Sequence, residues 1–285
     1  MIVFNITLIR HGETEANKQS IVQGQSDSTL TEEGCRQAKL VGERLQNEQF
    51  THTYSSDLGR CLNTTELILS CNKICQQQIT TSKLLRERNF GIFQGRPSSE
   101  MKDAAKKANK SFADYVPPGA ETKQQMQQRT RVFFEDLCQT MRNTYKDSST
   151  DRCSDLGISP IHGTPRSRTL STGSGRITSS DDEELTPSLS ADVLIVTHGG
   201  FLKAIIKTFI DDYNCVMTIG KGLALRISPN CGLSKFKVYL EEDRKPHIVC
   251  LALHEADHLQ TDSVSQCQHA ENVCRVAQFG VGEFV

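Results

Sequence analysis

The chain has 285 residues, of which 36% are hydrophobic and 24% charged, and its mean hydropathy is −0.43; this composition excludes a fully disordered chain and fits no integral membrane protein. No apolar run approaches the ~20 residues that are needed to cross a bilayer. The formal net charge of −1 gives no overall reason to expect nucleic acid or an anionic membrane as the partner, so any anion must be bound by a local cluster of charge.

Strand and helix patterns alternate through the first part of the chain. An apolar, β-rich run over residues 2–9 ends at Arg10-His11-Gly12, and Thr31 caps a helix whose apolar side chains recur at helical spacing up to Leu45. Residues 53–56 are typical of a short strand that leads into a second helix with one apolar face. This alternation predicts an α/β fold with a mostly parallel central sheet.

The middle of the chain contains a long helical pattern and then a segment without periodicity. Thr122 and Gln125 match a capping box, which predicts a helix that continues to Met141. Residues 148–190 are rich in serine and threonine, and such a segment buries too little apolar surface to offset the entropy of ordering it. We therefore expect a flexible insertion. Hydroxyls beside arginines in 166–171 make it a candidate for regulatory phosphorylation, although an unmodified linker is the simpler interpretation.

The sheet is expected to resume after the insertion. Residues 193–196 are predicted to form a buried strand, followed by an amphipathic helix through Phe209. Further strands are predicted at 224–227, 233–240 and 248–253. The prediction is therefore a single domain over residues 1–260, interrupted by the insertion and followed by a polar tail over 261–285.

Two histidines occur in the same local context. His11 and His198 each follow an apolar strand and precede a glycine that lets the chain turn. Because the carboxyl ends of strands in an open α/β sheet form the edge where ligands bind, neighbouring strands would bring both imidazoles to one pocket. Arg10 lies beside His11, and Arg60 lies in the first turn of a predicted helix. Two guanidinium groups with two imidazoles favour a tetrahedral oxyanion, since guanidinium geometry matches phosphate oxygens in pairs.

These residues lie within five blocks that resemble the signature of the histidine phosphatase (phosphoglycerate mutase-like) superfamily. The blocks are Leu8-Ile9-Arg10-His11-Gly12-Glu13-Thr14, Ser55-Ser56-Asp57-Leu58, Arg86-Glu87-Arg88-Asn89-Phe90-Gly91, Pro118-Gly119-Ala120-Glu121 and Val196-Thr197-His198-Gly199. The resemblance implies a central sheet with helices on both faces. Within the superfamily the chain is most similar to fructose-2,6-bisphosphatases that regulate glycolysis and apoptosis.

The resemblance also implies a role for each matched residue. His11 would attack phosphorus and become transiently phosphorylated, and Glu87 would protonate the departing sugar oxygen and then activate water. Glu87 must then be protonated near neutrality, which Arg86 and Arg88 would oppose unless they point elsewhere. The remaining matches form two groups: Arg10, Arg60 and His198 would hold the phosphoryl oxygens, and Asn17, Gln23, Gly24 and Gly199 would contact the phosphoryl group or the substrate.

The implied activity is that of a metal-independent phosphatase that needs no cofactor and acts on a small phosphorylated metabolite. Fructose 2,6-bisphosphate is the expected substrate, and its hydrolysis would lower glycolytic flux. Superfamily mutases carry an adjacent arginine pair that is absent from this sequence, so hydrolysis is favoured. A phosphatase of bisphosphoglycerate or other phosphate esters and a non-catalytic phospho-ligand binder are the alternatives. The irregular cysteine spacing predicts a cytoplasmic location, to which the resemblance adds nuclear and mitochondrial association, and the sequence does not identify a protein partner.

A competing hypothesis is a zinc peptidase. Residues 254–258 match H-E-x-x-H, which on a helix places two zinc ligands one turn apart. The match follows a predicted strand and contains the charged Asp257, and both features weigh against zinc. The 11 cysteines lack the spacing of a disulfide scaffold, and the closest pair, Cys71 and Cys75, has no second pair to complete a zinc site. We therefore expect free thiols in a reducing compartment and no metal site.

Overall fold

The computed structural model describes residues 1–74, 78–112, 114–145, 189–217 and 219–260. The predicted insertion at 148–190, apart from its last two residues, and the predicted tail at 261–285 lie outside the described residues. None of the helices in the described ranges has the length and apolar character that crossing a membrane demands.

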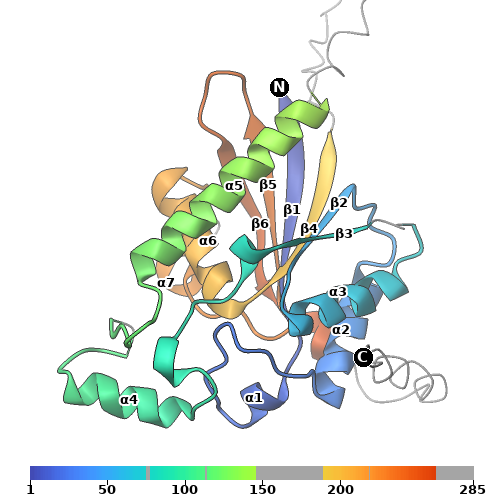
Figure 1. The fold of residues 1–285 in the computed structure, drawn as a ribbon. Coiled ribbons are helices and arrows are strands. Elements are labelled where there is room, and N and C mark those ends of the chain that lie inside the picture. The colour runs from blue at the N-terminus through green and yellow to red at the C-terminus, as the bar shows by residue number, and fades with distance from the viewer. Residues whose placement is uncertain (75–77, 113, 146–188, 218, 261–285) are drawn as a thin grey trace, which may run out of the picture.

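A six-stranded sheet forms the centre of the molecule (Figure 1). Its strands are β1 (Ile2–Arg10), β2 (His52–Ser56), β3 (Ile79–Ser82), β4 (Ala191–Thr197), β5 (Leu233–Leu240) and β6 (His247–Glu255). In space they follow the order β3-β2-β4-β1-β5-β6. The first four strands of that order are parallel, whereas β5 and β6 join antiparallel. The predicted α/β fold with a mostly parallel sheet is confirmed.

Helices connect the strands and cover both faces of the sheet. They are α1 (Glu15–Lys18), α2 (Glu32–Arg44), α3 (Gly59–Cys71), α4 (Ser98–Lys107), α5 (Lys123–Tyr145), α6 (Gly199–Asp212) and α7 (Lys221–Ala224), with 3-10 turns η1 (Lys83–Leu85), η2 (Gly91–Phe93) and η4 (Asp257–Gln260). Both predicted caps are present. Oγ1 of Thr31 accepts a hydrogen bond from the N–H of Gly34 at 2.9 Å, and Thr122 exchanges hydrogen bonds with Gln125 at 2.8 and 3.1 Å.

Alternating strand residues build one apolar core on each face of the sheet. Phe4, Ile6 and Leu8 of β1 pack with side chains of α5 and α6, and Figure 1 shows these two helices lying across the strands. Ile9 of β1 and Val196 of β4 instead pack with side chains of α2 and α3. Because side chains alternate along a strand, one sheet supplies both cores.

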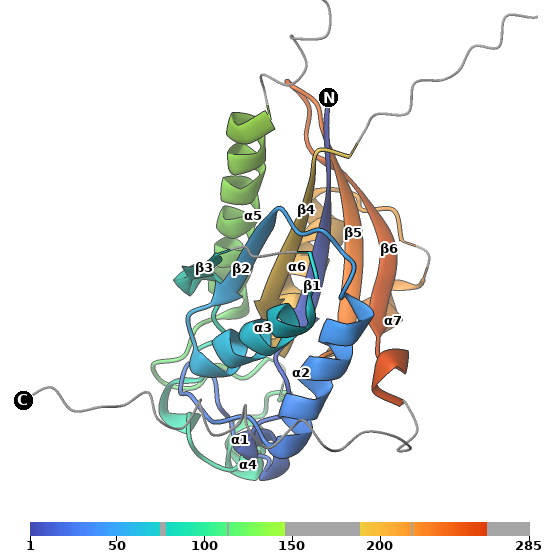
Figure 2. The same ribbon diagram turned by 90° about the vertical axis from the view of Figure 1, so that its right-hand side faces the viewer.

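The pairing of β1 with β4 joins the two halves of the chain. The strands are parallel and in register from Phe4 opposite Ala191 to Arg10 opposite Thr197. They therefore end side by side, and His11 and His198 follow them at the same edge of the sheet. Figures 1 and 2 both show α1 and α4 at this end of the molecule.

The prediction of a strand at 224–227 is wrong. Ala224 is the last residue of α7, and residues 225–230 form turns and irregular chain. A run of only four mostly apolar residues has no periodicity that distinguishes a strand from the end of a helix. Burial also breaks off within the run, because Ala224 is buried while Arg226 and Ile227 are exposed.

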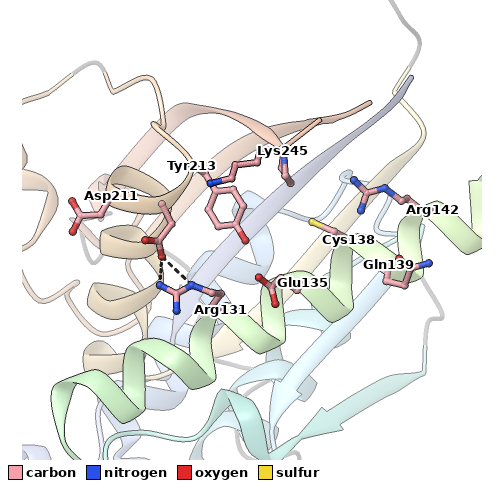
Figure 3. Close-up of a pocket in the computed structure, with 10 residues that line it drawn as sticks. Arg131, Glu135, Cys138, Gln139, Arg142, Asp211, Tyr213 and Lys245 are labelled. Atoms are coloured by element: carbon pink, nitrogen blue, oxygen red, sulfur yellow. Dashed lines mark hydrogen bonds and ion pairs between the residues drawn. The ribbon is translucent and has the colours of Figure 1, made fainter. Parts of the chain in front are cut away.

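A hollow of about 550 Å³ lies between α5, α6 and the turn that joins β5 to β6 (Figure 3). Its charged side chains are three basic and three acidic ones: Arg131, Arg142, Lys245, Glu135, Asp211 and Asp212. Arg131 and Asp212 form an ion pair at 2.6 Å. The balanced charge gives no preference for an anion, and none of the predicted site residues lines this hollow.

Candidate active site

His11 is held in one tautomer at the end of β1. Its backbone N–H donates to the carbonyl oxygen of Thr197 at 2.9 Å, and its ring Nδ1 lies 2.7 Å from the carbonyl oxygen of Gly12. Because a carbonyl oxygen only accepts, Nδ1 carries the proton and Nε2 of the neutral ring presents a lone pair. Burial, together with Arg10 and Arg60, lowers the pKa of His11 well below its usual value. The ring is therefore neutral at pH 7 and available as a nucleophile.

The ring of His198 faces that of His11. Their centroids are 5.3 Å apart and their planes meet at 61°. His198 is fully buried and precedes the first turn of α6. Its Nε2 lies 2.9 Å from Oγ of Ser56 and 3.4 Å from Sγ of Cys61. Burial first, and then Arg60, lower the pKa of His198 well below its usual value, so two neutral imidazoles meet without charge repulsion.

Arg60 offers a buried donor beside the two histidines. Its side chain is 1% exposed, Nη1 donates to the carbonyl oxygen of Ser26 and Nη2 to that of Gly24, both at 2.7 Å. Nη1 also lies 3.3 Å from Oδ1 of Asp27. Nε is buried and has no hydrogen-bond partner among the described residues. Since an unpaired buried donor costs about 1–3 kcal/mol, an anion bound at this point would remove that cost.

Arg10 provides a second donor of the same kind. Its Nη1 donates to the carbonyl oxygen of Ser228 at 2.8 Å, while its buried Nε finds no partner in the described part of the chain. A Cβ on Gly199 would stand 3.3 Å from this Nε and 2.9 Å from Cγ2 of Ile227, so a side chain at Gly199 would crowd the guanidinium. Two buried guanidinium groups with unpaired Nε atoms and two imidazoles therefore concentrate hydrogen-bonding groups suited to an anion, in a chain whose net charge is −1.

Glu87 reaches the same cluster from the segment between η1 and η2. Its Oε2 accepts a hydrogen bond from the N–H of Gly200 at 2.8 Å, and its Oε1 accepts one from the N–H of Arg88 at 2.7 Å. Gly200 lies in the first turn of α6, two residues after His198. The carboxyl group is therefore fixed next to the helix end that carries the second histidine.

The two arginines that flank Glu87 point elsewhere. Arg86 forms a two-point ion pair with Asp57 at 2.7 and 2.6 Å. Arg88 donates from Nε to the carbonyl oxygen of Glu121 at 2.8 Å. Neither guanidinium forms a hydrogen bond or ion pair with the carboxyl of Glu87 in the described structure, because each has another partner.

The residues predicted to contact the substrate have different surroundings. Asn17 lies in α1, where its Oδ1 accepts hydrogen bonds from Thr14 at 3.0 and 3.2 Å. Oε1 of Gln23 is buried and unpaired within the described ranges. Gly24 has φ +56°, in the left-handed region, and a Cβ there would stand 2.3 Å from Oε1 of Gln94, so the position favours glycine. Its carbonyl group holds Arg60, which links this loop to the histidines.

Sequence reasoning missed four residues that shape the site. They are Ser56 on the ring of His198, Gly200 on the carboxyl of Glu87, Ser228 on the guanidinium of Arg10, and Asn230, whose Nδ2 donates to the carbonyl oxygen of His11 at 3.0 Å. Ser56 lies inside a matched block, and Gly200 forms a Gly-Gly pair after His198. Ser228 and Asn230 follow residues 224–227, where the apolar pattern predicts a strand that the structure does not have, and no sequence signal distinguishes them.

The zinc hypothesis is not supported by the backbone. His254 and Glu255 belong to β6 and His258 to η4, so the three do not share a helix. Glu255 pairs with Arg44 at 2.5 Å. In the ranges that the structure describes, no three His, Cys, Asp or Glu side chains are placed to hold a metal ion. Cys71 is a free cysteine, as are Cys61, Cys138, Cys215, Cys231 and Cys250, and Cys75 lies outside the described residues.

Comparisons with known proteins identify the family. The profile described as the histidine phosphatase superfamily (branch 1) matches residues 6–145. The chain is 37% identical to the fructose-2,6-bisphosphatase TIGAR of Xenopus tropicalis, over 91% of this chain and 96% of that protein. It is 35% identical to TIGAR of Mus musculus, over 93% and 99%.

A solved structure shows the same fold. The phosphoglycerate mutase from Bacillus anthracis str. Sterne matches with a TM-score of 0.62 at 21% identity, over 90% of this chain and 96% of that chain. The predicted fold class and the predicted phosphatase are thereby confirmed. This chain belongs to the histidine phosphatase superfamily and is a phosphatase enzyme.

Proposed function

We propose that this protein hydrolyses fructose 2,6-bisphosphate to fructose 6-phosphate through a phosphohistidine intermediate on His11, and that it thereby lowers glycolytic flux. The names of the Xenopus tropicalis and Mus musculus relatives support this substrate. The observation that carries the covalent step is the 2.7 Å contact between Nδ1 of His11 and the carbonyl oxygen of Gly12. It leaves Nε2 without a proton, in a ring on which Arg10 and Arg60 act electrostatically, and both of these arginines have an unpaired, buried Nε.

In the first step, Nε2 of His11 forms a bond to phosphorus and the bond between phosphorus and the sugar oxygen breaks. The departing oxygen keeps the electron pair and takes a proton from the carboxyl group of Glu87. Phosphorylation at Nε2 makes the ring positively charged, and the carbonyl oxygen of Gly12 stabilises that charge through Nδ1–H. Arg10, Arg60 and His198 hold the equatorial oxygens, where charge must be stabilised in phosphoryl transfer.

In the second step, water replaces the sugar. The carboxylate of Glu87 takes a proton from the water, whose oxygen bonds to phosphorus while the bond to Nε2 breaks. Inorganic phosphate leaves and His11 returns to its neutral form. Asn17, Gln23, Gly24 and Gly199 border the bound substrate in this proposal. The unpaired amide oxygen of Gln23 suits a hydroxyl group of a sugar.

The proposal includes a cytoplasmic location, with nuclear and mitochondrial association, as the family resemblance implies. We also propose that residues 1–260 form one domain. Strand β4, which follows the predicted insertion, pairs in parallel with β1 and β2, which precede it.

A panel of phosphate esters tests the substrate assignment. Phosphate release is measured with fructose 2,6-bisphosphate, 2,3-bisphosphoglycerate, phosphoenolpyruvate and a range of sugar monophosphates, and kcat/KM is compared, because discrimination is a ratio of these values. We expect the highest value for fructose 2,6-bisphosphate. A higher value for another ester would move the assignment to that ester. Binding of inorganic phosphate without turnover of any ester would instead identify a non-catalytic binder.

A further inference from the structure

The segment after α7 forms hydrogen bonds with residues at and after the end of β1, where His11 lies. We call residues 225–231 the backing loop. The carbonyl oxygen of Ser228 accepts from Arg10 at 2.8 Å, and Nδ2 of Asn230 donates to the carbonyl oxygen of His11 at 3.0 Å and to Oδ1 of Asn17 at 3.3 Å. One short stretch of chain therefore holds three residues of the predicted site.

The backing loop ends in a strained conformation. Cys231 is fully buried and has φ +52°, in the left-handed region that favours glycine. Its N–H donates to the carbonyl oxygen of Arg10 at 3.0 Å. A residue other than glycine persists in this region only when its surroundings impose the conformation. The groups that hold Cys231 are therefore part of what shapes the site.

The two histidines of the H-E-x-x-H segment hold the two ends of this loop. Nε2 of His254 lies 3.0 Å from the carbonyl oxygen of Ala224, immediately before the loop. Nε2 of His258 lies 3.0 Å from the carbonyl oxygen of Cys231, its last residue. Since carbonyl oxygens only accept, both Nε2 atoms donate. Both Nδ1 atoms are buried without a partner in the described structure, so the loop carbonyls are the hydrogen-bond partners of these rings.

The segment that carries these histidines is itself anchored to the α2 side of the molecule. Glu255 pairs with Arg44 of α2 at 2.5 Å. Leu259 packs against the core formed with α2 and α3. The segment that carries the histidines thus contacts α2 and its core as well as the backing loop.

We propose that His254 and His258 are positioning residues of the phosphatase, which hold the backing loop in the shape that places Arg10, His11 and Asn17. This inference rests on the proposed function, because that function gives the positioned residues their roles. Each histidine acts through a main-chain carbonyl group and not on the substrate. The segment that matches a zinc motif thus serves phosphoryl transfer.

Phenylalanine substitutions test the two contacts separately. His254→Phe and His258→Phe keep an aromatic ring of similar size and remove the donated hydrogen. Because misplacing a reacting group by about 1 Å costs on the order of 100-fold, we expect each variant to lose about 10- to 100-fold in kcat/KM. His258→Gln retains an N–H donor and should recover a substantial part of the loss. His247→Phe is the matched control, since it lies at the opposite end of β6 and is exposed; it should match the wild type.

A second readout separates positioning from loss of stability. Affinity for inorganic phosphate, measured by titration calorimetry well below the Tm of every variant, should fall with kcat/KM in the two phenylalanine variants, because Arg10 is displaced. Both rings are partly exposed, so the variants are expected to fold, and each tests one end of the loop independently of the other. Circular dichroism and Tm verify the fold.

The outcomes distinguish this inference from the proposed function. A wild-type protein that turns over no phosphate ester overturns the proposed function. An active wild type, with both phenylalanine variants unchanged in kcat/KM and phosphate affinity, overturns the positioning role alone. Equal impairment of His258→Gln and His258→Phe would show that the donated hydrogen is irrelevant. Stoichiometric zinc in the wild type, lost in either phenylalanine variant, would make the segment a metal site and refute the inference.

Discussion

The substitution Gly200→Ala should lower the catalytic rate without lowering the stability of the fold. A Cβ at this position would stand 2.2 Å from Oε1 and 3.0 Å from Cδ of Glu87. Contacts below 3.0 Å do not occur for real Cβ atoms, so the carboxyl oxygen must move by at least about 0.8 Å, the difference between 3.0 and 2.2 Å. The obstacle is the flexible end of a side chain, and Gly200→Ala therefore displaces the acid without disrupting the backbone.

The magnitude follows from that displacement. Moving a catalytic group by about 1 Å costs on the order of 100-fold in rate, while general acid catalysis contributes at most about 10⁴-fold. We expect Gly200→Ala to lower kcat on a sugar phosphate by about 100-fold. Because Gly200 is the second residue of α6 and alanine is the better helix former, the free energy of unfolding should not fall and could rise by up to about 1 kcal/mol.

The leaving group makes the assay diagnostic. A sugar alkoxide needs the proton of Glu87, whereas the phenolate released from p-nitrophenyl phosphate needs little protonation, so the variant should lose much less activity on the second substrate. Gly222→Ala is the matched control, since it is the second residue of α7 and has no atom within 4 Å of the added Cβ. Equal losses on both substrates, or no loss on the sugar phosphate, would refute the role of Glu87 as the acid.

Three further predictions follow from the site and the sheet. His11→Ala should abolish turnover and the acid-labile phosphoenzyme seen after quenching while leaving circular dichroism unchanged; undiminished turnover would end the covalent proposal. In the folded protein the pKa values of His11 and His198 lie well below the ordinary 6.5. Below pH 6.5 the unfolded chain therefore binds more protons than the folded protein does, and the free energy of unfolding should fall as the pH drops below 6.5. Urea unfolding from pH 7 to 5 should show a smaller fall for His198→Gln, and an equal fall would contradict the assignment. Cutting an engineered protease site between residues 148 and 190 should leave both fragments associated and active, because β4 pairs with β1 and β2; separation of the fragments by gel filtration would show that the sheet does not hold them.

Local signals made most of the described elements predictable. The caps at Thr31 and Thr122 depend on side chains within three residues of each helix start, and β1 and β4 consist mostly of apolar and β-branched residues. β3 and α4 were not predicted. β3 has a single apolar residue, Ile79, among its four, and α4 buries only Met101 and Ala105. Neither element has enough buried apolar surface to produce a readable period.

The histidine pair was predictable because parallel strands end at the same edge of a sheet. Once β1 and β4 are neighbours, the positions of His11 and His198 follow from the position of each after its strand. The contact of Gly200 with Glu87 spans 113 residues, and that of Asn230 with His11 spans 219. No periodic pattern encodes such pairs, because they depend on how loops from separate elements meet.

The backbone conformation of the H-E-x-x-H segment determines which groups its two histidines can contact. On a helix, the two histidines would lie one turn apart on the same face and could share one metal ion. Here His254 has φ +54° at the end of β6, and His258 follows in a 3-10 turn. The two rings donate to different carbonyl groups, those of Ala224 and Cys231, which are seven residues apart in the chain. With Nε2 of each ring donating to a carbonyl oxygen, only the two Nδ1 atoms remain to bind a metal ion, and no three His, Cys, Asp or Glu side chains among the described residues are placed to hold one. The contacts that this backbone gives the two histidines are therefore those of positioning residues, with both Nε2 atoms on the main chain at the ends of the backing loop.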